Sequence, residues 1–356
     1  MNFELTEERR MLQDTLRRYL RAEYSTERRN AILDSAAGYA PEIWSGLADL
    51  GVIGALFDEA QGGFGGAGFD IAVVFEELGR AGVVEPLLDG ALLAGRALAL
   101  AGRQDIVDGL IAGDVQLAFA HYEPGGRYDL DYVQTEASGG GLTGRKAVVM
   151  HGGAAEHIVV SARDGDQIGL YLVNAGAPGL DARDYPLLAG GRAAEVMLDN
   201  TPAEPLGLGL AEIESLVALA MVAQCAEALG AMETAVALTQ DYLMTRKQFG
   251  RPIGTFQALA HRMADLLIEL EQARSAVINA AGMLGTRDEA TTLAASKNLI
   301  GRVGRQVAEE AIQMHGGIAM TQEYELAHIA KRIIMADHRF GDTDYHLERF
   351  IALSAA

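Results

Sequence analysis

The chain has 356 residues, with 29 Lys and Arg against 49 Asp and Glu, and its formal net charge is −20 at pH 7. A chain of this length buries roughly three quarters of its unfolded surface and corresponds to about two or three domains. The negative charge argues against nonspecific binding to nucleic acid or to an anionic membrane, because long-range electrostatics repel both. Local basic residues must therefore hold any ligand that carries phosphate.

Cysteine and histidine usage narrows the chemistry further. The single cysteine, Cys225, lies in an apolar helical pattern without a nearby base, so we interpret it as a buried, unreactive thiol. The eight histidines show no H-x-x-x-H or similar ligand spacing, so no metal site is predicted. The N-terminal ten residues are charged, and we find no apolar run of membrane-spanning length. We therefore expect a protein of the reducing cytoplasm.

The first part of the chain, residues 1–113, is predicted to form a helical domain. Apolar residues from Met11 to Leu20 recur every three or four positions, which lines one face of an amphipathic helix. The same pattern returns at 44–50 and at 71–78.

A glycine-rich loop separates the last two of these helices. Gly63, Gly65 and Gly68 have the G-x-G-x-x-G spacing of dinucleotide-binding folds. That motif acts only where a strand precedes it and a helix N-terminus receives the pyrophosphate. Helical patterns flank it here, so a plain connecting loop is favoured over a dinucleotide site.

The middle of the chain, residues 114–203, changes to short β-like runs separated by glycine-rich turns, which predicts a compact antiparallel sheet or a barrel-like domain. The runs are 115–120, 146–150, 157–161, 169–173 and 195–198.

Helical patterns resume in the last part, residues 204–356. Long apolar patterns cover 213–245, 256–284 and 289–314. Helices of nearly thirty residues or more are typical of bundles that pack helix against helix and often form subunit interfaces. The fold class expected is mainly α, with a small β-domain between two helical domains.

Two local blocks carry a more specific signal. The sequence Thr-Arg-Lys-Gln-Phe-Gly-Arg-Pro-Ile-Gly-Thr-Phe-Gln spans 245–257, and Gln-Met-His-Gly-Gly spans 313–317. Each block alone has a simple alternative, since basic residues often follow a helix C-terminus and Gly-Gly often caps one. With the opening Leu-Thr-Glu-Glu at 5–8 and the helical, β, helical order, the chain resembles the acyl-CoA dehydrogenases over nearly its whole length.

The resemblance implies an FAD-dependent enzyme that converts an acyl-CoA thioester to a 2-enoyl-CoA, with an electron-accepting partner that is itself a flavoprotein. In that family the first block contacts the FAD of a neighbouring subunit, and the second approaches its adenosine and pyrophosphate. A guanidinium suits pyrophosphate, an aromatic side chain can cover a ring, and glycines let backbone N–H groups approach phosphate. The implied FAD contacts are Arg246, Gln248, Phe249, Gln257, Gln313, Gly316 and Gly317, with Thr343 near the flavin.

The catalytic base is not at its usual place. Most of the family uses a Glu near the C-terminus, and the matching slot here is Gly341; a minority uses a slot that falls near Ala220. The neighbouring carboxylate, Asp342, is our candidate base, with Glu214 as a weaker one. The alternative for Asp342 is an N-cap of the final helix, where Asp is common.

The β-domain also departs from the family. The segment that touches flavin and CoA reads Tyr-Glu-Pro-Gly at 122–125, and Lys-Ala-Val-Val-Met-His at 146–151 lacks the Trp and Thr that cover the flavin ring. The adenosine side of the FAD site is kept while the ring side is changed.

Two hypotheses follow from this split. The chain is either a catalytic subunit of a homo- or hetero-oligomer or a non-catalytic, flavin-sharing partner of a longer companion. The tail at 340–347 resembles the small subunits of bacterial enzymes that act on steroid side chains or pimeloyl-CoA. A different flavin reaction is permitted by the missing Glu but has no positive support.

Overall fold

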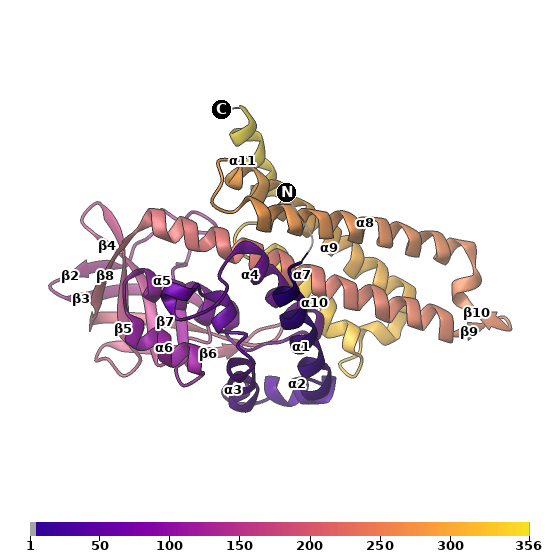
Figure 1. Ribbon diagram of the computed structural model, residues 1–356, viewed down its shortest axis with the longest axis horizontal. Helices are drawn as coiled ribbons and strands as arrows, with labels where there is room; N and C mark the ends of the chain where they lie inside the picture. The colour runs from indigo at the N-terminus through magenta and orange to yellow at the C-terminus, as the bar shows by residue number, and fades with distance from the viewer. Residues whose placement is uncertain (1–4, 356) are drawn as a thin grey trace. The chain divides into compact units, whose positions relative to one another are not determined.

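The computed structural model describes residues 5–355, and the chain divides into two compact units (Figure 1). A helical unit contains residues 1–26, 68–83 and 221–356; a mixed unit contains residues 27–67 and 84–220. The predicted class is confirmed: the chain is mainly helical, with its main sheet in the middle of the sequence. Strand β8 (Glu204–Gly209) carries this sheet to the start of the long helix, so the limits at 113 and 203 stay predictions.

The helical unit is built from long helices that run side by side (Figure 1). The three long patterns predicted from the sequence all form helices, within a few residues of their expected limits. The helices are α1 (Glu7–Glu23), α4 (Gly68–Ala81), the larger part of α7 (Leu210–Thr245), α8 (Gln257–Met283), α9 (Glu289–His315), α10 (Glu325–Asp337) and α11 (Thr343–Ala355).

Helix α7 corrects one expectation. It is 36 residues long and, by length and composition alone, one helix of the described chain that could cross a bilayer. The expectation that no apolar run reaches that length is therefore wrong. Its most apolar 18-residue window is 83% buried inside the protein, however, as in a core helix that packs on several sides.

Two glycines let α4 and α7 approach closely. A Cβ atom at Gly79 would lie 1.9 Å from the carbonyl oxygen of Glu227, and one at Gly230 would lie 1.9 Å from that of Glu76. Each glycine thus receives the backbone of the other helix, and any larger residue at either position would force the two helices apart.

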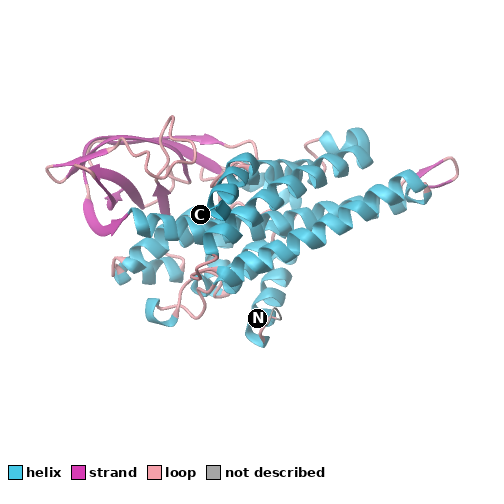
Figure 2. Ribbon diagram, turned by 90° about the horizontal axis from the view of Figure 1, so that it is seen from above, coloured by secondary structure: helices cyan, strands magenta, loops and turns pink. Residues whose placement is uncertain are grey.

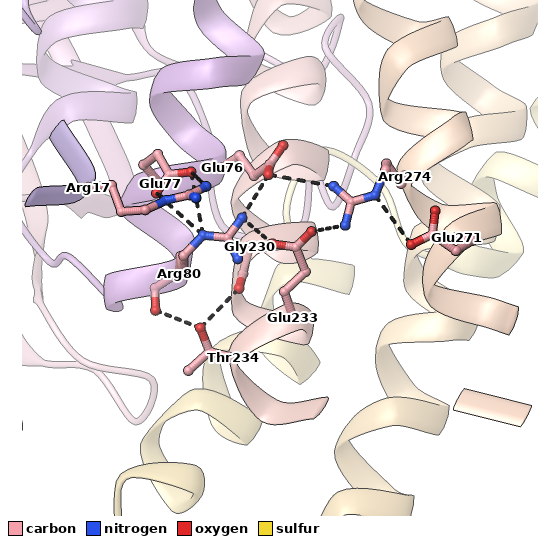
Figure 3. Close-up of polar contacts among 9 residues, drawn as sticks. All are labelled: Arg17, Glu76, Glu77, Arg80, Gly230, Glu233, Thr234, Glu271 and Arg274. Carbon is pink, nitrogen blue, oxygen red and sulfur yellow. Dashed lines mark hydrogen bonds and ion pairs between the residues drawn. The ribbon is translucent and has the colours of Figure 1, made fainter. Parts of the chain in front are cut away.

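Beside this contact, four charged side chains from three helices form a closed ring (Figure 3). Arg80 pairs with Glu76 at 2.8 Å and also with Glu233; Arg274 contacts Glu233 and lies 3.8 Å from Glu76. Every carboxylate therefore faces two guanidinium groups, which compensates for much of the cost of removing these charges from water. The ring borders a cavity of about 510 Å³.

The mixed unit begins with short helices around the glycine loop. Two turns of 3-10 helix, and no strand, precede this loop, as the connecting-loop interpretation requires. Cβ atoms at Gly63 and Gly65 would lie 2.3 Å from backbone oxygens of Phe57 and Ala55. These glycines are needed for backbone packing. The helical elements are α2 (Thr26–Leu33), α3 (Pro41–Asp49), η1 (Gly54–Leu56), η2 (Glu59–Gln61), the π-helix η3 (Leu87–Ala94), α5 (Gly95–Leu100) and α6 (Gln104–Ala112).

One curved sheet completes the mixed unit (Figure 2). Its strand order is β6-β7-β3-β2-β4-β5-β8, with β1 paired to β4, so it ends in two different edge strands and is open rather than a closed barrel. Most pairs are antiparallel, but β1 and β2 run parallel to β4. All five predicted runs lie on strands; β2, β6 and β8 were not predicted. The remaining strands are β1 (Leu117–Ala120), β2 (Glu136–Ser138), β3 (Gly141–Met150), β4 (His157–Asp164), β5 (Gln167–Asn174), β6 (Leu180–Pro186) and β7 (Arg192–Pro202).

Candidate functional site

The first sequence block lies at the tip of the α7–α8 pair. After α7, the antiparallel strands β9 (Lys247–Gln248) and β10 (Arg251–Pro252) form a short hairpin whose turn has two residues. Phe249 and Gly250 occupy its turn with φ values of 52° and 79°, the left-handed backbone that such a turn needs. Phe249 is 92% exposed, and its ring lies edge-to-face with that of Phe256, with ring centroids 6.2 Å apart. The fold therefore presents an aromatic side chain outward at this tip.

The second block ends α9 beside α7. The buried His315 ring stacks on Tyr242 of α7 with centroids 4.5 Å apart. Its Nδ1 lies 2.8 Å from the carbonyl oxygen of Ala311, which can only accept, so Nδ1 carries the proton and Nε2 accepts from the Tyr324 hydroxyl at 3.1 Å. Burial lowers the pKa of His315, which favours this neutral form.

A bidentate ion pair joins the same ends of α8 and α9. Arg262, just after the first block, donates to both carboxylate oxygens of Glu310, at 2.5 and 2.8 Å, just before the second block. The structure thus brings the two blocks together at one end of the helical unit.

The residues of this end are suited to an external ligand. All seven implied adenosine-side contacts are exposed. A Cβ atom at Gly317 would meet no atom within 4 Å, so the chain's own packing does not require glycine there. Exposed donors, an exposed ring and an open glycine backbone fit an adenosine diphosphate moiety. The residues that fit are Arg246, Gln248, Phe249, Gln257, Gln313, Gly316 and Gly317.

The segment around the usual base slot lies toward the other end of α9. Asn298 donates to the carbonyl oxygen of Thr343 at 2.9 Å. Asn298 and Gln313 are 15 residues apart, which corresponds to about 22 Å along the helix. Thr343 and Asp342 are therefore remote from the adenosine-side group.

Asp342 caps the last helix. Its Oδ1 accepts the backbone N–H of Tyr345 at 2.9 Å, and Asp342 immediately precedes α11. The capping role weighed from the sequence is thus present, and the proposed role as base stays a prediction. The Thr343 hydroxyl donates to Asp337 at 2.9 Å, so its proton is used within the chain.

The Gly341 slot is closed by its own surroundings. Gly341 has a φ of 107°, which side-chain-bearing residues rarely adopt. A Cβ atom there would lie 2.4 Å from Nε2 of the buried His346, which donates to the carbonyl oxygen of Phe340 at 2.8 Å. Burial lowers the pKa of His346 to about 4. A glutamate side chain at 341 has no room in this conformation.

The alternative slot also lacks a carboxylate. Ala220 is fully buried, and Glu214, the weaker candidate, is exposed on the first turns of α7.

A buried ion pair organises the β-domain. Lys146 of β3 donates to Glu123 at 2.6 Å and to Ser161 at 2.9 Å, and Glu123 also accepts from the backbone and hydroxyl of Thr135. Burial lowers the pKa of Lys146 to about 8 and that of the adjacent His121 to about 4. The Glu123 carboxylate therefore holds the 122–135 segment against the sheet.

The strand that carries residues 146–151 has an irregular backbone. Strand β3 has a bulge between Lys146 and Val149. Val148 has a φ of 53°, which is strained for a β-branched residue, and its side chain is 50% exposed. An exposed aliphatic side chain thus stands at this bulge, where the resemblance implies an aromatic one, and it offers no ring to stack on a flavin.

Sequence reasoning missed three buried polar groups: the Glu123–Lys146 pair, Lys297 and His346. Lys297 could have been found, because it continues the spacing of Leu293 and Ile300 on the buried face of α9. The Glu123–Lys146 pair joins segments 23 residues apart, and His346 bonds Phe340, six residues earlier, only because the loop between them folds back.

Comparison with known proteins agrees with this organisation. Residues 6–106 and 207–352 match the acyl-CoA dehydrogenase N-terminal and C-terminal domains. The chain is 31% identical to acyl-CoA dehydrogenase IpdE2 of Mycolicibacterium smegmatis, over 98% of this chain and 99% of that protein.

Solved structures of acyl-CoA dehydrogenases also match this chain. A variant of the Tcur3481–Tcur3483 steroid acyl-CoA dehydrogenase matches with a TM-score of 0.90 and 31% identity over 98% of each chain. The ChsE4–ChsE5 complex of Mycobacterium tuberculosis shares the fold, with a TM-score of 0.91 and 24% identity over 100% of this chain and 99% of that chain.

These findings define an FAD-dependent oxidoreductase fold. The chain belongs to the acyl-CoA dehydrogenase family.

Proposed function

We propose that this chain is the flavin-sharing subunit of a heteromeric, cytoplasmic acyl-CoA dehydrogenase that forms a 2-enoyl-CoA. In this proposal it supplies the adenosine-side half of an FAD site, and a companion chain supplies the catalytic carboxylate. The similarity to the Tcur3481–Tcur3483 enzyme and to the fold of the ChsE4–ChsE5 complex supports an assembly of unlike chains.

One observation carries the proposal. The usual base slot is a glycine in left-handed backbone whose Cβ direction is filled by His346. A simple loss of Glu would leave space for the missing side chain, whereas this segment has no such space. The adenosine-side residues, in contrast, remain exposed at the far end of α9.

The division of labour follows from the side chains. When bound, FAD would supply the hydride acceptor for the β-carbon of the thioester. Arg246 would place a fixed positive charge near the pyrophosphate, Phe249 would cover a ring, and Gly316 and Gly317 would offer backbone N–H groups. The companion would remove the α-proton with its carboxylate.

A surface suited to assembly accompanies this site. A groove of about 1180 Å³ runs between α8 and α9 and includes the exposed side chains of Leu267 and Ile268. Exposed apolar helix faces of this kind commonly mark subunit contacts. The electron acceptor is proposed to be a separate flavoprotein.

The test is the visible absorption of the chain purified alone and after co-expression with a longer paralogue that retains the Glu. We expect little flavin in the chain alone and a full flavin band in the complex. Stoichiometric flavin and dehydrogenase activity in the chain alone would contradict the proposal.

Asp342 remains the candidate base for the second possibility, a chain that is catalytic alone, because it is next to the slot and half-buried. Asp342→Asn separates the two roles, since Asn caps helices about as well as Asp but cannot take the proton. In the heteromeric complex we expect turnover to persist with flavin content unchanged. Asp344→Asn, in an exposed neighbour, is the matched control; loss of turnover in Asp342→Asn alone would make Asp342 the base.

A further inference from the structure

Lys297 is a buried cation held by backbone groups. Its side chain is on α9 and the residue is 1% exposed. Its Nζ donates to the carbonyl oxygens of Ala336 at 3.0 Å, Asp337 at 3.0 Å and Gly341 at 2.9 Å. All three ammonium protons are thus used on one segment of chain.

This arrangement fixes how α10 ends. The carbonyls of Ala336 and Asp337 belong to the last turn of α10, where carbonyl groups have no partner within the helix and the helix dipole favours a positive charge. The third carbonyl lies after the helix, at Gly341. One ammonium group therefore ties the end of α10 to the loop that follows it.

Two further residues of α9, within one turn of Lys297, also contact this segment. Asn298 bonds the carbonyl oxygen of Thr343. At Gly301, one turn on, a Cβ atom would lie 2.0 Å from the carboxylate of Asp337 and 2.4 Å from the hydroxyl of Thr343. The segment 337–343 is therefore bonded to α9 at both of its ends.

The backbone between these points includes a residue in the left-handed region. Phe340 has a φ of 58°, and a residue with a side chain persists there only where its surroundings determine it, whereas glycine readily adopts the φ of 107° found at Gly341. The Lys297 bond to Gly341 and the His346 bond to Phe340 fall on these two carbonyls. An ammonium group and an imidazole group thus hold the carbonyl oxygens of these two consecutive residues.

We infer that Lys297 is a positioning residue, which sets the course of segment 337–343 and so places Thr343 in this chain's part of the flavin site. The inference rests on the proposed function for the flavin contact of Thr343. Lys297 itself is enclosed by backbone and touches no reacting atom. Its effect reaches the site only through the segment that it holds.

The experiment combines hydrogen exchange with flavin retention in the co-expressed complex. Lys297→Met keeps an unbranched side chain that is one atom shorter and removes the charge and the three donors. We expect exchange across 337–346 to rise at least about tenfold, because charged hydrogen bonds are lost. We expect exchange in α8 to stay unchanged and FAD to dissociate faster.

Chemical rescue supplies a readout that loss of packing would not give. Lys297→Ala leaves space for a small alkylammonium, so ethylamine should slow both exchange and FAD release, while ethanol should not. Lys331→Met, a half-buried lysine on α10, is the matched control and should change neither.

Each outcome decides the inference. Unchanged exchange in Lys297→Met, or faster exchange with unaltered FAD release, would overturn it. A wild-type complex without FAD would instead contradict the proposed function. Hydrogen exchange, measured with and without ethylamine, would then still show whether Lys297 orders the segment 337–343.

Discussion

The two ends of α9 differ in whether their polar groups face solvent or are bonded within the chain. At one end Gln313, Gly316 and Gly317 are exposed, and a Cβ at Gly317 would meet open space. At the Lys297–Gly301 end the donors are bonded to the chain itself, and a Cβ at Gly301 would meet two oxygen atoms. The first end therefore leaves polar groups open to solvent, whereas at the second end they hold the segment 337–343 within the chain.

The difference shows that the role of a glycine or of a charged residue depends on whether the fold itself uses it. Gly301 and Gly317 belong to the same region of sequence, but one is required by the fold and the other is not. Lys297 and Arg246 are both cations, but the first is committed to carbonyls in the interior and the second faces solvent. A ligand site is identified by groups that the fold leaves unused.

The sharpest test of the comparison exchanges the two glycines for alanine. Gly301→Ala should lower the free energy of unfolding by about 2–3 kcal/mol, because the new methyl group displaces Asp337 or Thr343. Gly317→Ala should change stability by less than about 0.5 kcal/mol but weaken FAD retention in the complex. Urea denaturation and flavin analysis measure both; equal stability losses would remove the distinction.

The carboxylate of Glu76 tests whether the ion pairs of the helical unit offset the cost of burying its charge. Burial, and then the charge of Glu233, raises the pKa of Glu76 to about 7. A raised carboxyl pKa contributes stability that is fully present below the unfolded value of 4.5 and is lost as pH rises through about 7. Glu76→Gln should therefore be more stable than wild type at pH 8, by about 1–3 kcal/mol, and similar to it near pH 4.

Denaturant midpoints from pH 4 to pH 8 measure this difference. Glu271→Gln, at an exposed member of the same network, should follow the wild-type profile. Lower stability of Glu76→Gln at pH 8 would show that the ionised ring is net stabilising.

The smallest effect on folding is expected at the hairpin tip. Phe249→Ala removes a side chain that is 92% exposed, so the free energy of unfolding should change by less than about 0.5 kcal/mol. FAD retention in the complex should nevertheless fall. Thr255→Ala, near the same tip, provides the control, and unchanged FAD retention in Phe249→Ala would remove that residue from the site.

Much of the helical architecture could be predicted from the sequence. The periodicity between residues 213 and 314 gave three long helices within a few residues of α7, α8 and α9, because long apolar patterns allow few other structures. Strands β2, β6 and β8 were missed for local reasons. Strand β2 has three residues, β6 is mostly exposed, and β8 follows Pro202 and contains Pro205, and each feature weakens an alternating pattern.

The candidate site likewise contains residues that local motifs predicted and contacts that only the fold creates. Local motifs were sufficient to propose Arg246, Phe249 and Gly317, since each depends on its own turn or helix end. The hold of Lys297 on the loop, the closure of the Gly341 slot by His346 and the Glu123–Lys146 pair join residues 5 to 44 positions apart.

The sequence by itself therefore determined the family and the helix order, and it was sufficient to propose the residues of the adenosine-side group. Only the tertiary structure decided that these residues are exposed together, while the segment at 337–343 is closed. The physical reason is that periodicity and turn chemistry are local, whereas burial and the partner of each polar group depend on which segments the fold brings into contact.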